Sequence, residues 1–254
     1  MKNAFDWLER LSLDAVLVAM AWGLALGGRM MDLLVLGIAT WLAYVADRLW
    51  EVRPAKDVPQ TDRHLYYLNH YRKFGLAWVM GLGASTTLAL LFLPLWKVLG
   101  GCALVALISL YLYLLGRPMG FSGKLALKRS VVPLVFAAGV VWMSESWRST
   151  DGIAGSMVLL SAAFANLLLI SCRENRDQFL PAWLPRATGA SLLGMLLVAN
   201  AALLVHWPVG VAGLLCCMGY FVLMVRIRAA DVVHARAWAD GCLLVSGLLL
   251  FWVS

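Results

Sequence analysis

Charged residues are scarce in this sequence. Asp, Glu, Lys and Arg together make up 14% of its 254 residues, whereas about a quarter of a soluble domain is charged. Hydrophobic residues make up 62%, and the mean hydropathy is +0.81. This composition excludes an ordinary soluble domain. It indicates a chain that lies mostly within a membrane, where a helix needs about 20 residues to cross the hydrocarbon.

The sequence also shows no pattern typical of a cysteine framework or of a secretory signal. The five cysteines have neither the spacing of a zinc site nor that of a disulfide framework, so we expect them to be structural or incidental. They are Cys102, Cys172, Cys216, Cys217 and Cys242. At the N-terminus, Asp6, Glu9 and Asp14 interrupt the apolar pattern, and no secretory signal peptide is expected there.

Apolar stretches of membrane-spanning length recur along the whole chain. They predict an all-α membrane protein with about nine transmembrane helices in a single domain, residues 1–254. The predicted spans are residues 13–28, 31–50, 74–95, 98–115, 125–143, 153–172, 187–205, 208–225 and 237–253. Trp residues near many span ends are typical of the two membrane interfaces.

The basic residues indicate the orientation. If the N-terminus is cytoplasmic, all of the 21 Lys and Arg residues except Arg29, Lys97 and Arg148 fall on the inner side. Such an excess is the positive-inside signal of an integral protein of a bacterial-type inner (plasma) membrane. The net charge of +7 is therefore interpreted as topology. Because the basic residues are divided among short loops, no nucleic-acid partner is expected.

The second predicted span carries a stripe of polar residues. Thr40, Tyr44, Asp47 and Glu51 lie on one helical face. Asp47 and Glu51 are one turn apart at its inner end, where two carboxylates can hold a divalent cation together with the phosphates that the cation carries. The alternative is that Asp47 pairs with Arg48 or another basic residue at the interface.

The sixth predicted span repeats this pattern. Asn166, Arg173 and Asp177 share a face, and Glu174 lies beside them. Two spans that both end on the inner side therefore carry acidic residues in line with other polar groups. Charge pairing of these acids with Arg173 and Arg176 is the alternative.

Further polar candidates lie at the inner ends of other spans. Tyr66, Asn69, His70 and Lys73 share a face at the start of the third span, where His70 could contact a phosphate, carry a proton or cap local polar groups. After the fourth span, Lys124 and Lys128 are one turn apart and lie on the same side of the membrane as the acids. Positive-inside anchoring is the alternative for each of these lysines.

These features together resemble the UbiA superfamily of intramembrane prenyltransferases. The first motif of that family, NDxxDxxxD, aligns with residues 43–51. Its last two acids are present as Asp47 and Glu51, while Ala43 and Tyr44 replace the Asn-Asp pair. The second acidic motif has Glu174 and Asp177 as its candidates, at a different spacing. Two basic elements also resemble the family: Arg63, which follows the first motif, and Tyr113 with Arg117 after the fourth span.

The resemblance implies a site and a chemistry. It implies a helical bundle with a central cavity open to the cytoplasmic side, in which magnesium ions bridge acidic residues and a prenyl diphosphate. We expect Asp47 and Glu174 to face each other across this cavity, because their helices end on the same side. The implied metal ligands are Asp47, Glu51, Glu174 and Asp177. The implied diphosphate-binding residues are Arg63, Tyr113, Arg117, Lys124 and Lys128, and Tyr44 and His70 are the implied catalytic candidates.

Three functions remain open from the sequence. The first is a magnesium-dependent prenyltransferase that joins an isoprenoid chain to a lipophilic, aromatic or other, acceptor. The second is a terpene cyclase of the same superfamily, in which the allylic cation reacts with its own double bonds. The third is a non-catalytic, lipid-binding or scaffold member, which the replacement of the first two motif residues by Ala43 and Tyr44 favours.

Overall fold

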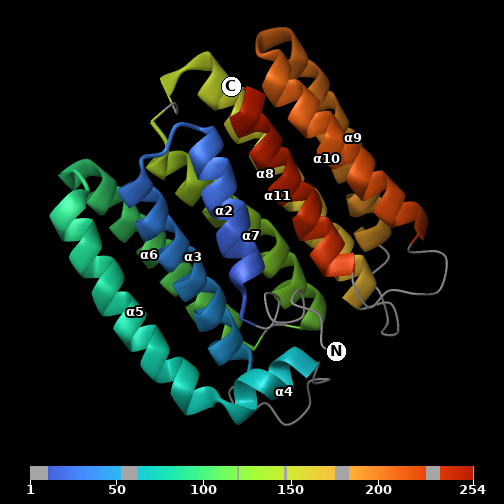
Figure 1. Ribbon diagram of the computed structural model, residues 1–254. Helices are drawn as coiled ribbons and strands as arrows, with labels where there is room; N and C mark the ends of the chain where they lie inside the picture. The colour runs from blue at the N-terminus through green and yellow to red at the C-terminus, as the bar shows by residue number, and fades with distance from the viewer. Residues whose placement is uncertain are drawn as a thin grey trace, which may run out of the picture.

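Helices are the only regular secondary structure in the described part of the chain (Figure 1). The computed structural model describes residues 11–52, 62–118, 120–145, 148–174, 183–226 and 235–253. Its helices, in chain order, are α2 (Leu13–Ala25), α3 (Met30–Glu51), α4 (Asp62–Asn69), α5 (Tyr71–Phe92), α6 (Leu95–Leu115), α7 (Phe121–Met143), α8 (Thr150–Glu174), α9 (Trp183–Val205), α10 (Trp207–Arg226) and α11 (Ala235–Val253).

Six of these helices are long and apolar enough to cross a membrane: α3, α5, α6, α7, α8 and α9. Three shorter apolar helices lie within α2, α10 and α11. Each span predicted from the sequence falls on one of these nine elements. The prediction of an all-helical fold is therefore confirmed for the described residues. The six long apolar helices are compatible with an integral membrane protein, and the count of nine spans stays a prediction.

The helices form antiparallel neighbours joined by short connections at one end of the bundle. Residues 26–29 join α2 to α3, residues 93–94 join α5 to α6, and His206 joins α9 to α10. Figure 1 shows α5 and α6 along one edge of the bundle and α9 and α10 along the opposite edge. Helices α2, α3, α7, α8 and α11 lie between these edges, and α2 packs against both α3 and α11.

The core depends on small residues that let the helices approach closely. Ala19, Ala162 and Ala239 are fully buried, and small side chains are typical of helix interfaces in membranes, where close van der Waals contact drives association. Trp22 of α2 is buried, and it donates its Nε1–H to the Leu243 carbonyl oxygen of α11 at 2.9 Å. Helices from the two ends of the chain are therefore linked directly.

The chain bends between α4 and α5. His70 leaves helical geometry, with φ −115° and ψ 20°. Nearby, the Tyr67 ring stacks on Phe74 at a centroid distance of 4.3 Å. Tyr66 and Asn69 lie on α4, whereas Lys73 lies on α5. The face predicted for these residues is therefore not one continuous helix face.

Candidate functional site

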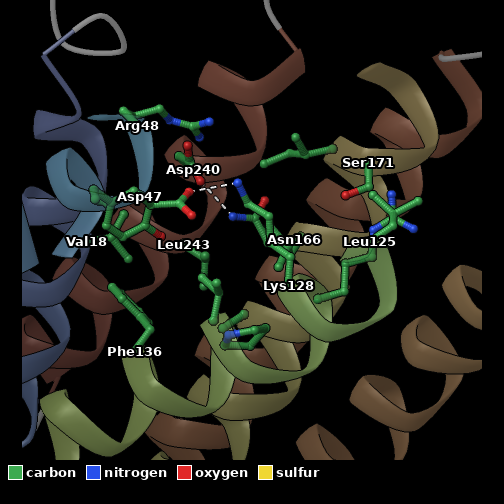
Figure 2. Close-up of a pocket in the computed structure, with 18 of the residues that line it drawn as sticks. Val18, Asp47, Arg48, Leu125, Lys128, Phe136, Asn166, Ser171, Asp240 and Leu243 are labelled. Atoms are coloured by element: carbon green, nitrogen blue, oxygen red, sulfur yellow. Dashed lines mark hydrogen bonds and ion pairs between the residues drawn. The ribbon is translucent and has the colours of Figure 1, made fainter. Parts of the chain in front are cut away.

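A cavity of about 200 Å³ lies between α2, α3, α7, α8 and α11 (Figure 2). It is at the end of the bundle where α3 and α8 end and α7 and α11 begin. Its polar lining residues are Tyr44, Asp47, Arg48, Glu51, Lys128, Arg129, Asn166, Ser171 and Asp240. The charged residues comprise three acids and three bases, so the formal charges of the lining balance.

One wall is formed by the acidic pair of α3 and a lysine of α7. The Lys128 ammonium donates to Asp47 Oδ2 at 2.7 Å and to Glu51 Oε1 at 2.5 Å. Arg48 Nη1 donates to the other oxygen of Glu51 at 2.5 Å, and the Tyr111 hydroxyl donates to Asp47 Oδ1 at 3.2 Å. Because Asp47 and Glu51 are one helical turn apart, a single ammonium reaches both carboxylates.

A second polar pair in the lining comes from α8 and α11. Asn166 of α8 donates its Nδ2–H to Asp240 Oδ1 of α11 at 2.6 Å. Asn166 is only 8% exposed, and its Oδ1 has no hydrogen-bond partner among the described residues. A buried acceptor without a partner is costly, so a donor from a ligand or a water molecule would stabilise it. Figure 2 shows Asp47, Asp240 and Asn166 facing the same space.

Helix α7 also supplies part of the apolar lining. Phe136 lies two turns along α7 from Lys128 and, with Val18 and Leu243, belongs to the apolar part of the lining. Pro133 lies between Lys128 and Phe136, and it lacks the N–H that would bond the carbonyl oxygen four residues earlier. The cavity is thus charged on one side and apolar on the other, and Figure 2 shows Phe136 and Arg48 on opposite sides of it.

No family model matches the chain. Searches of curated proteins and of solved structures also give no match. The resemblance to the UbiA superfamily therefore depends on the helix pattern and the residues quoted above, and family membership stays a prediction.

The structure brings some of the predicted site residues to this cavity. Tyr44, Asp47, Glu51 and Lys128 all line it, although they come from two helices that are far apart in sequence. The alternative predicted for Asp47, pairing with a basic residue, is also observed, because Asp47 is bonded to Lys128.

Other predicted residues lie away from the cavity lining. Tyr113 is 55% exposed and accepts a hydrogen bond from Arg117, and Lys124 is exposed on the first turn of α7. His70 donates from Nδ1 to the Tyr66 carbonyl oxygen at 3.0 Å, at the junction of α4 and α5. Local capping, one of its three predicted roles, is therefore the one seen here.

Three predicted residues cannot be placed at the site. The side chains of Arg63 and Glu174 lie outside the described part of the structure, although both residues belong to helices. Asp177 lies outside the described residues altogether. The prediction that Glu174 faces Asp47 across the cavity therefore stays a prediction.

Arg129 and Asp240 were not predicted as site residues. Asp240 lies near the start of a predicted span, where an ionisable residue by itself indicates a functional or paired position. Arg129 follows Lys128 directly, and it is 3% exposed, so it is not an anchor on the membrane surface. The burial of Arg129 could not be read from the sequence, because it depends on the helices packed around α7.

The donor set of α3 is chemically suited to magnesium. Carboxylate oxygens are the ligands that magnesium prefers, and one or two of them together with substrate phosphates are often enough. Within the described residues, no group of three or more His, Cys, Asp or Glu side chains is placed to hold a metal ion. In the structure, the Lys128 ammonium donates to one oxygen of each of these two carboxylates, so it lies where the pair would meet a metal ion.

Proposed function

We propose that this protein is a UbiA-like intramembrane prenyltransferase. It would transfer the isoprenoid chain of a prenyl diphosphate to a lipophilic acceptor, such as an aromatic compound, within the membrane. The observation that carries the proposal is the cavity, in which charged residues of α3 and α7 face apolar residues such as Phe136 and Val18. A prenyl diphosphate has the same division between a charged head and an apolar chain.

The side chains of the cavity have separate parts in the proposed reaction. Arg48, Lys128 and Arg129 carry the positive charge that would stabilise the diphosphate as it leaves. Asp47 and Glu51 would hold magnesium, which, when bound, would offset the charge that develops on the leaving group. The apolar lining excludes water from the allylic cation, and the face of Phe136 could stabilise that cation.

The proposal includes the predicted membrane arrangement. It comprises nine spans in a single domain, a cytoplasmic N-terminus and a cavity that opens to the cytoplasm, in a bacterial-type inner membrane. The distribution of Lys and Arg supports this orientation. The prenyl diphosphate, the acceptor and membrane lipid are then its proposed partners, with magnesium as the proposed cofactor.

A second candidate function is lipid binding without transfer. The specific observation in its favour is that Lys128 bonds both Asp47 and Glu51, which neutralises the acids without a metal ion. In such a protein the cavity would hold an amphiphile with an anionic head, and no bond to the isoprenoid chain would be broken.

The release of inorganic diphosphate tests the proposal. The purified protein in lipid nanodiscs is incubated with prenyl diphosphates of several chain lengths and candidate aromatic acceptors, with and without Mg²⁺. We expect magnesium-dependent release, and we expect Asp47→Asn to lower it at least about tenfold because a charged oxygen ligand is lost. The matched control is Asp151→Asn, an exposed acid at the opposite end of α8, which should leave the release unchanged.

The products separate the remaining functions. A prenylated acceptor indicates a transferase, whereas a cyclic hydrocarbon or alcohol indicates a cyclase. If no diphosphate is released with any chain length while a prenyl diphosphate still binds, the transferase proposal fails and lipid binding without transfer replaces it.

A further inference from the structure

The Lys128 ammonium occupies the position between Asp47 and Glu51 that a divalent cation would take. We infer that Lys128 competes with that cation for the acidic pair. The pair then binds a divalent metal only together with a diphosphate, because the ammonium moves from the acids to the diphosphate. This inference rests on the proposed function, since it concerns the same cavity. It adds an order of binding, in which the free protein rejects the metal alone.

The first argument is geometric. Lys128 reaches from α7 to both acids of α3, at 2.7 Å and 2.5 Å. A lysine side chain has a flexible four-carbon stem and a compact charge, so its ammonium can move within the cavity while α7 stays in place. The Lys128 side chain is 22% exposed, which leaves it room to do so.

The second argument is the charge of the wall. Asp47 and Glu51 carry two negative charges, and Lys128 and Arg48 supply two positive charges at hydrogen-bonding distance. A free divalent cation would meet a wall that is already neutral and would be repelled by an ammonium a few ångströms away. An arriving diphosphate reverses this balance, because it adds negative charge and offers the ammonium a new partner.

The third argument is the buried acceptor that α8 contributes to the same cavity. Asn166 Oδ1 belongs to a lining residue, is buried, and has no partner among the described residues. Magnesium usually keeps several bound waters, and each of these is a strong hydrogen-bond donor. A metal ion with its waters would therefore satisfy an oxygen that the lysine alone leaves without a partner.

Binding of Mn²⁺, used as a paramagnetic substitute for Mg²⁺, tests the inference without any reaction. In the absence of diphosphate, we expect Lys128→Met to bind Mn²⁺ at least about tenfold more tightly than the parent, because a competing positive charge is removed. The matched control is Arg72→Met, which removes an exposed positive charge on the first turn of α5 and should bind as the parent does. Lys128→Met with Asp47→Asn should lose the gained site, which places the metal at the acidic pair.

The affinity for a diphosphate should change in the opposite direction to the affinity for Mn²⁺. Lys128→Met should bind an unreactive prenyl thiolodiphosphate less tightly than the parent, since the transferred ammonium is missing. If Lys128 had a purely structural role, its substitution would weaken the binding of Mn²⁺ and of the diphosphate together. If Lys128→Met does not fold in detergent, Lys128→Gln in lipid nanodiscs replaces it. Mn²⁺ binding by the parent without diphosphate also tests the inference and needs no variant.

Two results would overturn the inference. One is tight binding of Mn²⁺ by the parent in the absence of diphosphate. The other is a folded lysine variant that binds Mn²⁺ no better than the parent. Both differ from a failure of the proposed function: a gain of metal binding without any release of diphosphate keeps the inference and removes the transferase. Release of diphosphate without a gain of metal binding does the reverse.

Discussion

Lys97 and Asp32 form a buried ion pair at the end of the bundle opposite the cavity. The Lys97 ammonium donates to Asp32 Oδ2 at 2.6 Å and to the Met143 carbonyl oxygen at 3.1 Å, and Lys97 is only 3% exposed. The three residues lie on α3, α6 and α7. Because the surroundings exclude water, each charge depends on the other for its solvation.

We predict that Lys97→Met lowers the free energy of unfolding by about 3–5 kcal/mol, because it leaves the Asp32 carboxylate buried without its counter-charge. Denaturant unfolding in a mild detergent measures the change. The matched control is Arg29→Gln, which breaks an exposed pair with Glu145 at the same end of the bundle and should cost at most about 1 kcal/mol.

The double variant Asp32→Leu, Lys97→Met should recover much of the stability that Lys97→Met loses, since it buries no charge. Equal losses for Lys97→Met and Arg29→Gln would contradict this account, because the Lys97 pair would then behave as a surface pair.

At the scale of the element, α6 approaches α7 at a glycine. A Cβ atom on Gly100 would overlap the ring of Trp142. The Trp142 ring is itself held, because its Nε1–H donates to the Lys97 carbonyl oxygen at 3.2 Å. The next residue, Gly101, faces open space. Two adjacent glycines on one helix therefore have different roles.

We predict that Gly100→Ala destabilises the protein by about 1–3 kcal/mol, since the Trp142 ring or α6 itself must move to accept a methyl group. Gly101→Ala should be neutral or stabilising by up to about 1 kcal/mol, because alanine favours the helix. Thermal unfolding of the two variants in the same detergent measures the difference. If the two variants melt together, α6 and α7 are not in close contact at Gly100.

At the scale of the whole molecule, the two ends of the bundle differ in their connections. The connections at residues 26–29, 93–94, 144–149 and 206 carry two basic residues, Arg29 and Arg148. The segments between helices at the cavity end, residues 52–61, 116–120, 175–182 and 227–234, carry five: Arg53, Lys56, Arg117, Arg176 and Arg228. This difference supports the orientation in which the cavity end is cytoplasmic.

We predict that residues 51–73, 116–129 and 173–186 face the cytoplasm. In a variant without native cysteines, Arg117→Cys should resist a membrane-impermeant maleimide in intact cells and react after the membrane is opened. Arg148→Cys, an exposed position at the other end, should react in intact cells and serves as the control. Labelling of the Arg117→Cys variant from outside intact cells would reverse the proposed topology.

Local patterns predicted the elements and part of the site. Hydropathy and helical spacing located the long helices, because a helix that crosses hydrocarbon must satisfy its own backbone and be apolar along its length. The same spacing placed Tyr44, Asp47 and Glu51 on one face, and all three line the cavity. The prediction that Asn69 and Lys73 share one helix face was wrong, because the chain leaves helical geometry at His70.

The sequence by itself determined that the chain is helical, that several helices are long and apolar enough to cross a membrane, and that α3 carries two acids one turn apart. Each of these properties follows from the chemistry of neighbouring residues. Only the tertiary structure decided which partner each charge has. Lys128 meets Asp47 across 81 residues, Lys97 meets Asp32 across 65, and Asn166 meets Asp240 across 74. Such pairs depend on how the helices pack, and buried charges accept only the partner that packing brings within reach.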